Sequence, residues 1–224
     1  MIGTLFVVAT PIGNLEDITI RALRVLKEVD LVLCEDTRVT RKLLSRYEIS
    51  VPTMSYHQHS GEAAQNRIFE MLQEEKNIAL VCDSGTPGIS DPGNELISFL
   101  ARHDPDIPVV PIPGPAALSA LASIAGTYMS QFLFLGFPPH KKGRKKFFQQ
   151  VASSPYPVLF YESPHRILKS LRELKEALPH ASLVVGRELT KQFETVYRGT
   201  IDEVEEKLQK DKVRGEFTVL VAKA

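Results

Sequence analysis

The first half of the chain alternates short apolar runs with segments in which apolar residues recur at helical spacing. The apolar runs cover 4–9, 31–33, 53–56, 78–81 and 109–112. A polar or Gly/Pro-rich turn follows each run, and helical patterns fill the intervals between them. Because strands separated by helices form a mostly parallel sheet with both faces covered, this alternation predicts an α/β domain.

The run 78–81 leads into the loop 82–93, which holds three glycines and two prolines. Glycine permits positive φ angles and leaves room for a ligand, and proline stiffens a loop. Asp91 and Pro92 are typical of an N-cap and a first helical residue, so we expect the loop to end at a helix N-terminus. The stretch alone leaves two interpretations open: a ligand-binding loop, or a tight strand-to-helix turn without a ligand.

A run of three prolines and one glycine at 111–115 indicates a hinge between two domains. We expect an N-terminal α/β domain at 1–113 with a mostly parallel sheet, and a C-terminal α/β domain at 114–224 with a mixed sheet. In the second domain, Ser163 and Pro164 predict the start of a helix, and Thr200 and Glu203 form the capping-box pattern before the last helix.

Composition limits the classes of function. The chain is 43% hydrophobic and 24% charged, and no apolar run approaches the ~20 residues of a membrane span, so we do not expect membrane insertion. Lysine plus arginine equals aspartate plus glutamate at 27 each, which excludes polyanion binding by bulk charge but leaves a local basic patch open. Two cysteines and no signal peptide predict a cytoplasmic protein.

Several common motifs are absent from the sequence. It contains no Gly-x-Gly, no Walker A pattern, no Cys-x-x-Cys and no Gly-x-Ser-x-Gly, which argues against NAD, ATP, a structural metal and a hydrolase nucleophile. The remaining candidates are loops that leave the carboxyl ends of strands, where ligands bind in open parallel sheets. These loops cover 10–14, 35–38, 56–59, 83–91 and 113–116. We expect them to converge on a ligand, such as an adenosyl group, that main-chain groups recognise.

Six segments resemble one known family. They are Thr10–Leu15, Glu35–Arg38, Ser84–Gly93, Pro113–Ala117, Tyr161–Arg166 and Gly186–Lys191. Together they resemble the ribosomal RNA small subunit methyltransferase I family, a branch of the tetrapyrrole methylase superfamily. The resemblance implies two α/β domains of the class III S-adenosylmethionine-dependent methyltransferase type, with the cofactor in the interdomain cleft. It also implies a homodimer that methylates a cytidine ribose 2′-hydroxyl of 16S rRNA near the decoding centre.

The resemblance carries cofactor contacts onto specific residues. They are Pro11, Ser84, Gly85, Thr86, Pro87, Gly88, Ile89, Ser90, Pro115, Ala116, Tyr161, Arg187 and Gly215. Tetrapyrrole-modifying relatives usually carry Gly-Asp-Pro where this chain has Gly85-Thr86-Pro87, and this argues against a porphyrin or corrin substrate. Many members also continue past the last strand, whereas this chain ends at Ala224.

A ribose hydroxyl is a poor nucleophile, so a base, or a cation that favours the alkoxide, would help the reaction. Arg187, Lys191 and Glu216 are the predicted catalytic residues, because they flank strand ends of the second domain. Asp36, Arg38, His57 and Glu162 are further candidates. The alternative for each residue is an ion pair within a loop.

Five cations lie within the six residues 141–146. The predicted RNA-binding residues are Lys141, Lys142, Arg144, Lys145 and Lys146, together with Arg38. Basic side chains disfavour a helix N-terminus, so phosphate binding explains them better than helix stability does, although a solvated helix start is the alternative. The expected partner is 16S rRNA or the small ribosomal subunit.

Two other functions remain open at this point. One is a methylase of the same superfamily that acts on a small molecule, such as a tetrapyrrole, or on a protein side chain. The other is a non-catalytic RNA-binding assembly factor that retains the fold.

Overall fold

The structure is a computed structural model that describes residues 2–91, 93–211 and 213–222. The chain divides into two compact units, with the boundary between Ala116 and Ala117. The elements of the first unit are β1 (Leu5–Val8), the 3-10 helix η1 (Leu15–Asp17), α1 (Ile20–Glu28), β2 (Leu31–Cys34), α2 (Thr37–Arg46), β3 (Thr53–Ser55), α3 (Gly61–Gln73), β4 (Ile78–Leu80), α4 (Asn94–His103) and β5 (Val109–Ile112).

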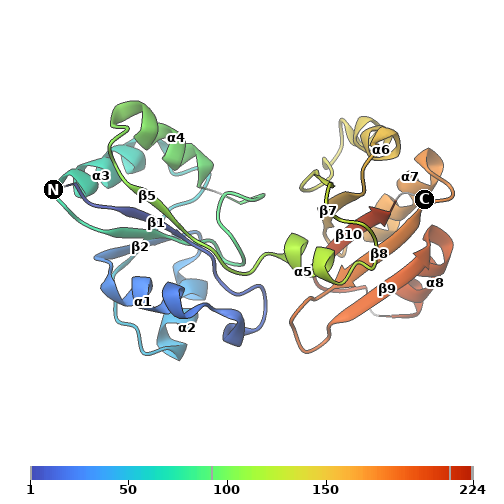
Figure 1. Cartoon of the computed structure of the whole chain (residues 1–224), viewed down its shortest axis with the longest axis horizontal. Coiled ribbons are helices and arrows are strands. Elements are labelled where there is room, and N and C mark those ends of the chain that lie inside the picture. The colour runs from blue at the N-terminus through green and yellow to red at the C-terminus, as the bar shows by residue number, and fades with distance from the viewer. Residues whose placement is uncertain (1, 92, 212, 223–224) are drawn as a thin grey trace. The chain divides into compact units, whose positions relative to one another are not determined.

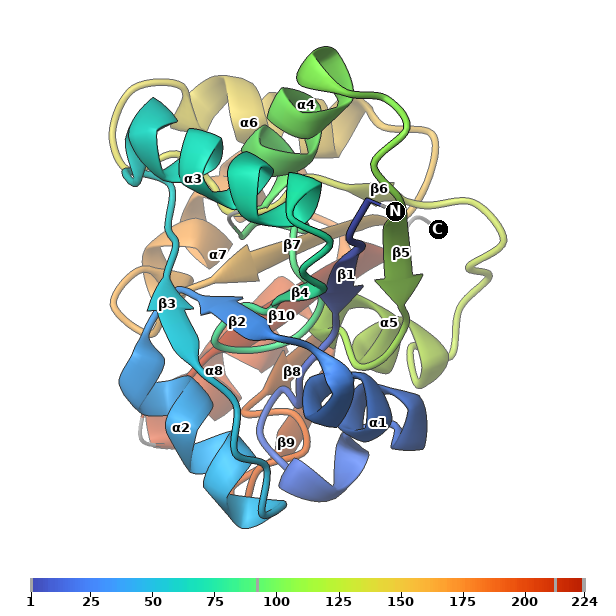
Figure 2. The ribbon, with the colours of Figure 1, turned by 90° about the vertical axis from the view of Figure 1, so that its left-hand side faces the viewer.

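The first unit is built on a five-stranded sheet in the order β3-β2-β4-β1-β5, and all of its strand pairs are parallel. Figures 1 and 2 show α1 and α2 on one face and α3 and α4 on the other. Two buried clusters correspond to these faces: Leu26 and Leu43 belong to one, and Leu72 and Leu96 to the other. The α/β class predicted from the strand-helix alternation is confirmed.

The topology places a switch point between β1 and β4. These strands are neighbours in the sheet, but the helices that follow them, α1 and α4, cover opposite faces. The chain therefore continues from β1 and from β4 toward opposite faces of the sheet, and the carboxyl edge at such a point is where open α/β sheets bind ligands.

The second unit carries a mixed sheet in the order β6-β7-β10-β8-β9, in which only the pair of β6 and β7 is parallel among the described strands. Its elements are α5 (Ala117–Ser123), β6 (Leu133–Phe134), α6 (Arg144–Ser153), β7 (Val158–Glu162), α7 (Ile167–Ala177), β8 (Ser182–Arg187), β9 (Thr195–Thr200), α8 (Ile201–Lys210) and β10 (Phe217–Ala222). Residues of α6, α7 and α8, such as Phe148, Leu171 and Val204, form one buried cluster with the sheet.

Two predicted helix starts are wrong. Helix α7 begins at Ile167 rather than at Pro164, because Arg166, with φ −123° and ψ −12°, departs from helical geometry at the N-cap position. A turn closed by the bond from Arg166 N to Ser163 O precedes the helix. Helix α4 begins at Asn94 rather than after Asp91. The capping box of α8 is confirmed, with both reciprocal hydrogen bonds between Thr200 and Glu203 in place.

Within the described ranges, no helix has both the length and the apolar character needed to cross a bilayer.

Candidate active site

The loops after β1 and β4 are joined at the switch point. Thr10 N donates to Gly85 O over 2.8 Å and Gly85 N donates to Thr10 O over 3.1 Å, which makes a short antiparallel bridge. The Thr10 hydroxyl lies 3.1 Å from Cys82 O, to which it donates. The predicted convergence of these two loops is confirmed, and Pro11, a proposed cofactor contact, is buried next to the bridge.

The loop after β4 is also held from within and from the hinge. Cys82 Sγ donates to Ser84 O and to Gly85 O, each over 3.3 Å, and burial together with the nearby Asp91 raises the pKa of this thiol to about 12. The thiol therefore stays neutral and serves as a donor. Thr86 Oγ1 donates to Pro115 O over 3.0 Å, so the hinge segment joins the same cluster of loops.

Gly85 and Gly88 have φ angles of 86° and 82°, as expected for glycines that expose their backbone. The predicted N-cap at Asp91 is wrong, and Pro92 lies outside the described residues. Gly93 occupies the N-cap position of α4 with φ 140°, and its lack of a side chain leaves this helix without a side-chain cap. Asn94 instead donates from Nδ2 to Gly88 O over 2.8 Å, which ties the helix back onto the loop.

A pocket of about 380 Å³ lies beside this loop. Its lining consists of Tyr56, Gln58, Gly88, Ser90, Asp91, Gly93, Asn94 and Glu95, so the loop after β3 joins the loop after β4 here. Two of the lining residues are carboxylates, and no Lys, Arg or His lines it among the described residues. The pocket therefore suits a ligand that carries positive charge or hydrogen-bond donors.

The loop after β2 joins the edge through Asp83, whose Oδ1 accepts from Asp36 N over 3.0 Å. Asp36 is the N-cap of α2, and its carboxylate also pairs with Arg38 at 2.6 Å. The hydrogen bond from the Arg38 side chain lowers the pKa of Asp36 to about 2. Arg38, a proposed RNA contact, is thus exposed but already paired with a carboxylate.

In the second unit, the end of β8 and the start of β10 bring together the three predicted catalytic residues. Lys191 Nζ donates to Glu216 Oε2 over 2.8 Å, and Arg187 Nε donates to Arg214 O over 2.9 Å. The proposed cofactor contact Gly215 lies in the same segment with φ 87°.

Sequence reasoning did not single out Glu188, which joins this group. Its Oε1 accepts from Lys191 Nζ over 2.9 Å and from Glu216 N over 2.9 Å. The i,i+3 spacing of Glu188 and Lys191 was the signal available in the sequence.

Tyr161, another proposed cofactor contact, lies on β7 among aromatic neighbours. Its ring centroid is 5.0 Å from that of Phe134 and 5.4 Å from that of Phe137, and its hydroxyl accepts from Leu118 N over 3.2 Å. Tyr161 therefore anchors the first turn of α5.

The cluster 141–146 divides into two groups. Lys141, Lys142, Lys145 and Lys146 are exposed, as expected for phosphate ligands. Arg144 is not: only 5% of its side chain is exposed, and its NH2 group lies 2.6 Å from Glu173 Oε2. The prediction that Arg144 contacts RNA is wrong, because buried carboxyl and hydroxyl partners already occupy its guanidinium.

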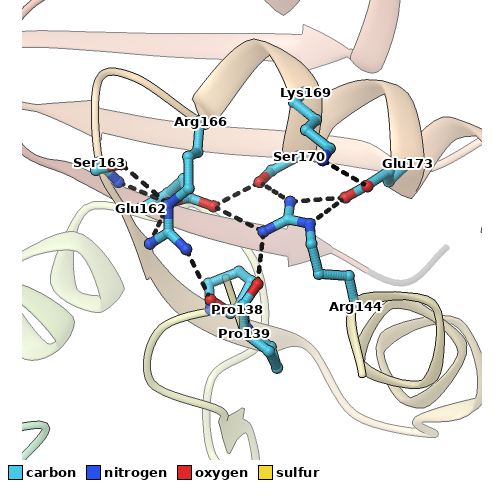
Figure 3. A network of polar contacts seen from close by, with 9 residues as sticks. All are labelled: Pro138, Pro139, Arg144, Glu162, Ser163, Arg166, Lys169, Ser170 and Glu173. Carbon is cyan, nitrogen blue, oxygen red and sulfur yellow. Dashed lines mark hydrogen bonds and ion pairs between the residues drawn. The ribbon is translucent and has the colours of Figure 1, made fainter. Parts of the chain in front are cut away.

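Figure 3 shows what Arg144 does instead. Its NH1 donates to Pro139 O over 3.0 Å and its NH2 to Ser170 Oγ over 2.8 Å. Glu162, whose side chain is fully buried, pairs with Arg166 at 2.9 Å and accepts from Ser170 Oγ. Arg166 NH1 donates to Pro138 O, so both arginines hold the loop that leads to the exposed lysines.

No cluster of three or more His, Cys, Asp or Glu that could hold a metal ion occurs among the described residues.

Comparison with known proteins identifies the family that the sequence segments resemble. Residues 4–205 match the family model for tetrapyrrole (corrin/porphyrin) methylases. A Bacillus subtilis protein named ribosomal RNA small subunit methyltransferase I is 45% identical over 98% of this chain and 75% of its own length. A Thermotoga maritima protein of the same name is 40% identical over 98% of each chain.

Solved structures share the fold at low sequence identity. A cobalt precorrin-4 methyltransferase superposes with a TM-score of 0.75 at 17% identity, covering 98% of this chain and 94% of that one. A Thermus thermophilus uroporphyrin-III C-methyltransferase complexed with S-adenosylhomocysteine gives a TM-score of 0.68 at 22% identity, covering 97% of each chain. Taken together, the matched family model and the relatives at 40–45% identity show that this chain belongs to the tetrapyrrole methylase family and, within it, to the ribosomal RNA small subunit methyltransferase I group.

Proposed function

We propose that this protein transfers the methyl group of S-adenosylmethionine to the ribose 2′-hydroxyl of a cytidine in 16S rRNA near the decoding centre. The observation that carries the proposal is the 45% identity, over 98% of the chain, to a relative named ribosomal RNA small subunit methyltransferase I. The Gly85-Thr86-Pro87 sequence supports an RNA substrate over a tetrapyrrole.

The residues of the first unit fit S-adenosylmethionine. The glycines at 85 and 88 have positive φ angles and expose main-chain groups, and the pocket beside them carries Asp91 and Glu95. This cofactor has an ammonium and a sulfonium group, both of which carboxylates favour. We propose Pro11, the segment 84–90, Pro115 and Ala116 as its contacts in this unit, and Tyr161, Arg187 and Gly215 as its contacts in the second.

Bound S-adenosylmethionine supplies a methyl group on a good leaving group, so alignment of the acceptor oxygen accounts for much of the required catalysis. We propose that Lys191 Nζ stabilises the negative charge that develops on this oxygen, that Glu216 Oε2 receives its proton, and that Arg187 orients the nucleotide. Lys191 Nζ and Glu216 Oε2 already lie 2.8 Å apart in the structure without a substrate.

Incubation with labelled S-adenosylmethionine and either free 16S rRNA or assembled small subunits tests the activity. We expect label in the RNA of at least one substrate and protection of a single cytidine linkage from alkaline cleavage, because a 2′-O-methyl group removes the attacking hydroxyl. Binding of S-adenosylmethionine without transfer to either RNA would favour another acceptor, and no binding at all would favour the non-catalytic assembly factor.

Alanine variants of Arg187, Lys191 and Glu216 test the proposed roles. We expect each to lower kcat. The affinity for S-adenosylmethionine should change little in the Lys191 and Glu216 variants, the pattern of an interaction made mainly in the transition state, and should fall in the Arg187 variant, because Arg187 is also a proposed cofactor contact. If all three variants turn over like the wild type, the catalytic groups lie elsewhere, and Asp36, Arg38 and His57 become the next candidates.

We also propose that the protein acts as a homodimer, as the family resemblance implies. Sedimentation equilibrium at micromolar concentration tests this, and a single monomeric species would contradict it.

A further inference from the structure

The hydrogen-bond ladder between β8 and β10 changes character one residue beyond its last regular pair. Arg187 and Phe217 are the last paired residues of the two strands. The next pair is Glu188 and Glu216, in which Glu188 N donates to Glu216 O over 2.9 Å. The reciprocal backbone bond is absent, because Glu188 turns to φ 50° and its carbonyl accepts Lys191 N over 3.0 Å instead.

The Glu188 side chain takes the place of that carbonyl. Its Oε1 accepts Glu216 N over 2.9 Å, and the same oxygen accepts Lys191 Nζ over 2.9 Å. Lys191 in turn donates to Glu216 Oε2 over 2.8 Å. One carboxylate oxygen thus fixes the backbone of one proposed catalytic residue and the side-chain nitrogen of another.

The side chains of Glu188, Lys191 and Glu216 differ in their exposure to solvent. Those of Glu188 and Lys191 are 20% and 28% exposed, and that of Glu216 is 74% exposed. Glu188 therefore lies behind the pair, and Glu216 is open to a substrate.

The local backbone is adapted to this arrangement. Glu188 and Thr190 both have positive φ angles, which non-glycine residues rarely adopt because the conformation is strained. A Cβ atom on Gly215 would overlap Cδ and Cγ of Glu188, so a glycine is needed for the side chain to lie across this strand. Strain of this kind persists where the surrounding structure holds it in place, and it occurs often at functional sites.

We propose that Glu188 is a positioning residue for methyl transfer, holding the Lys191 ammonium and the Glu216 carboxylate in the orientation that meets the acceptor hydroxyl. This inference rests on the roles given to Lys191 and Glu216 in the proposed function. In this proposal Glu188 acts through Lys191 and Glu216 rather than directly on the substrate or the cofactor.

The electrostatics agree with this role. Burial alone would lower the pKa of Lys191, but hydrogen bonds with the Glu216 and Glu188 carboxylates raise it above its ordinary value. Burial alone would raise the pKa of Glu188, but the Glu216 amide and Lys191 lower it. Lys191 is therefore a cation at neutral pH and acts through its charge rather than as a base. Removing the Glu188 charge should lower the pKa of Lys191.

Glu188→Gln is the test variant, because it keeps an oxygen for the Glu216 amide and removes only the charge. We expect kcat to fall about 10-fold or more with the KM for S-adenosylmethionine unchanged, since small misplacements of catalytic groups can cost up to about 100-fold. The alkaline limb of the pH profile of kcat should move to lower pH, because activity needs protonated Lys191. Glu188→Ala should have a larger effect on kcat.

Glu194→Gln is the matched control. Glu194 lies in the same turn, where its carboxylate accepts Thr190 N over 2.6 Å and its backbone N donates to Lys191 O over 3.0 Å. The variant keeps the backbone bond, and the Glu194 carboxylate bonds neither the Lys191 ammonium nor Glu216 in the structure. If the turn has only a structural role, Glu194→Gln should lower kcat as much as Glu188→Gln does, and neither variant should shift the pH profile of kcat. That result would overturn the proposal.

Wild-type kcat and an unchanged pH profile in both Glu188 variants would also overturn the proposal. Failure of the proposed function would give a different result: the wild type itself would transfer no methyl group to RNA. In that case, NMR titration of ¹⁵N-labelled lysine decides. A lowered pKa of Lys191 in Glu188→Gln supports the positioning role, and an unchanged one contradicts it.

Discussion

Gly215 is a residue at which one added methyl group should disturb the proposed catalytic group directly. It combines a φ of 87° with direct contact to the Glu188 side chain, so alanine there would meet both backbone strain and steric overlap. The strain alone costs about 1–2 kcal/mol.

We expect Gly215→Ala to displace Glu188 and to lower kcat about 10-fold or more, together with a loss of stability. Gly143→Ala is the matched control, because Gly143 has φ 93° but a Cβ atom there would meet only Pro139, at 3.6 Å. Equal kcat values for the two variants, measured with labelled S-adenosylmethionine, would contradict the special role of Gly215.

Gly85 tests the cofactor contact in the same way. Its φ is 86°, and a Cβ atom would lie 3.3 Å from Ile12 Cγ2 and 3.7 Å from Pro115 O. We expect Gly85→Val to abolish S-adenosylmethionine binding in calorimetry while thermal unfolding stays cooperative.

The control for backbone strain is Gly126→Val, at φ 69° with nothing within 4 Å of a Cβ atom. It should bind the cofactor normally. Near-normal affinity in Gly85→Val would show that the loop does not lie against the ligand.

Asp36 gives a pH dependence of stability. Because the hydrogen bond from Arg38 holds its pKa at about 2 in the folded state, below the ordinary value near 3.9, its contribution is present above about pH 4. This contribution is lost as the pH falls toward 2.

Asp36→Asn keeps a good N-cap for α2 but removes the charge. We expect its melting temperature to be lower than that of the wild type at pH 6 and the difference to close by about pH 2, as measured by circular dichroism. High salt should reduce the difference, since the group is exposed. A difference independent of pH would contradict this origin.

Among the elements, α6, α7 and β7 are tied together by ionic side chains as well as by their apolar cluster. Arg144 from α6 meets Ser170 and Glu173 from α7, and Glu162 at the end of β7 lies between Arg144 and Arg166. Every buried side-chain polar atom in the described part of the chain has a hydrogen-bond partner, so each member of this network depends on the others.

Glu162→Gln should therefore lower the free energy of unfolding by about 3 kcal/mol, because it leaves two largely buried guanidinium groups without their shared charge. Glu173→Gln is the control: its side chain is 27% exposed, and water can compensate for part of the loss, so about 1 kcal/mol is expected. Urea unfolding measures both changes. Equal losses would show that burial does not set the strength of these pairs.

On the scale of the whole molecule, the charges balance, with 27 basic and 27 acidic residues. Any attraction to RNA must then come from local groups such as the exposed lysines at 141, 142, 145 and 146. The network around Arg144 holds the loop that carries the first two of them (Figure 3).

We expect the change of all four lysines to glutamine to flatten the slope of log K against log salt by roughly 3 for a single-stranded RNA segment, if each lysine neutralises one phosphate. S-adenosylmethionine affinity should not change. Arg144→Gln provides the contrast, since it should lower stability and leave the slope nearly unaltered. RNA binding with unchanged slope in the lysine variant would show that the cluster only solubilises this face.

Much of the fold and part of the site could be predicted from local patterns. Apolar periodicity predicts the parallel sheet of the first unit, and the Thr200 and Glu203 pair predicts the capping box of α8, because these signals act over a few residues. The sequence also places Gly85 and Gly88 in a loop with positive φ, since glycine is the residue that such backbone needs.

Other features were decided only by the tertiary structure, because they depend on contacts between residues far apart in the sequence. In the sequence Arg144 is one of five cations within six residues, but in the structure it is buried and bonds Ser170 and Glu173, 26 and 29 residues away. Helix α7 starts at Ile167 because the backbone of Arg166 is not helical, and the Arg166 side chain bonds Ser163 and the distant Pro138. Glu188 meets Glu216 across 28 residues, and no local spacing indicates that contact. Short-range sequence signals therefore determined the elements, while the pairing of charges, which requires folded strands and helices side by side, determined which side chains are free to act.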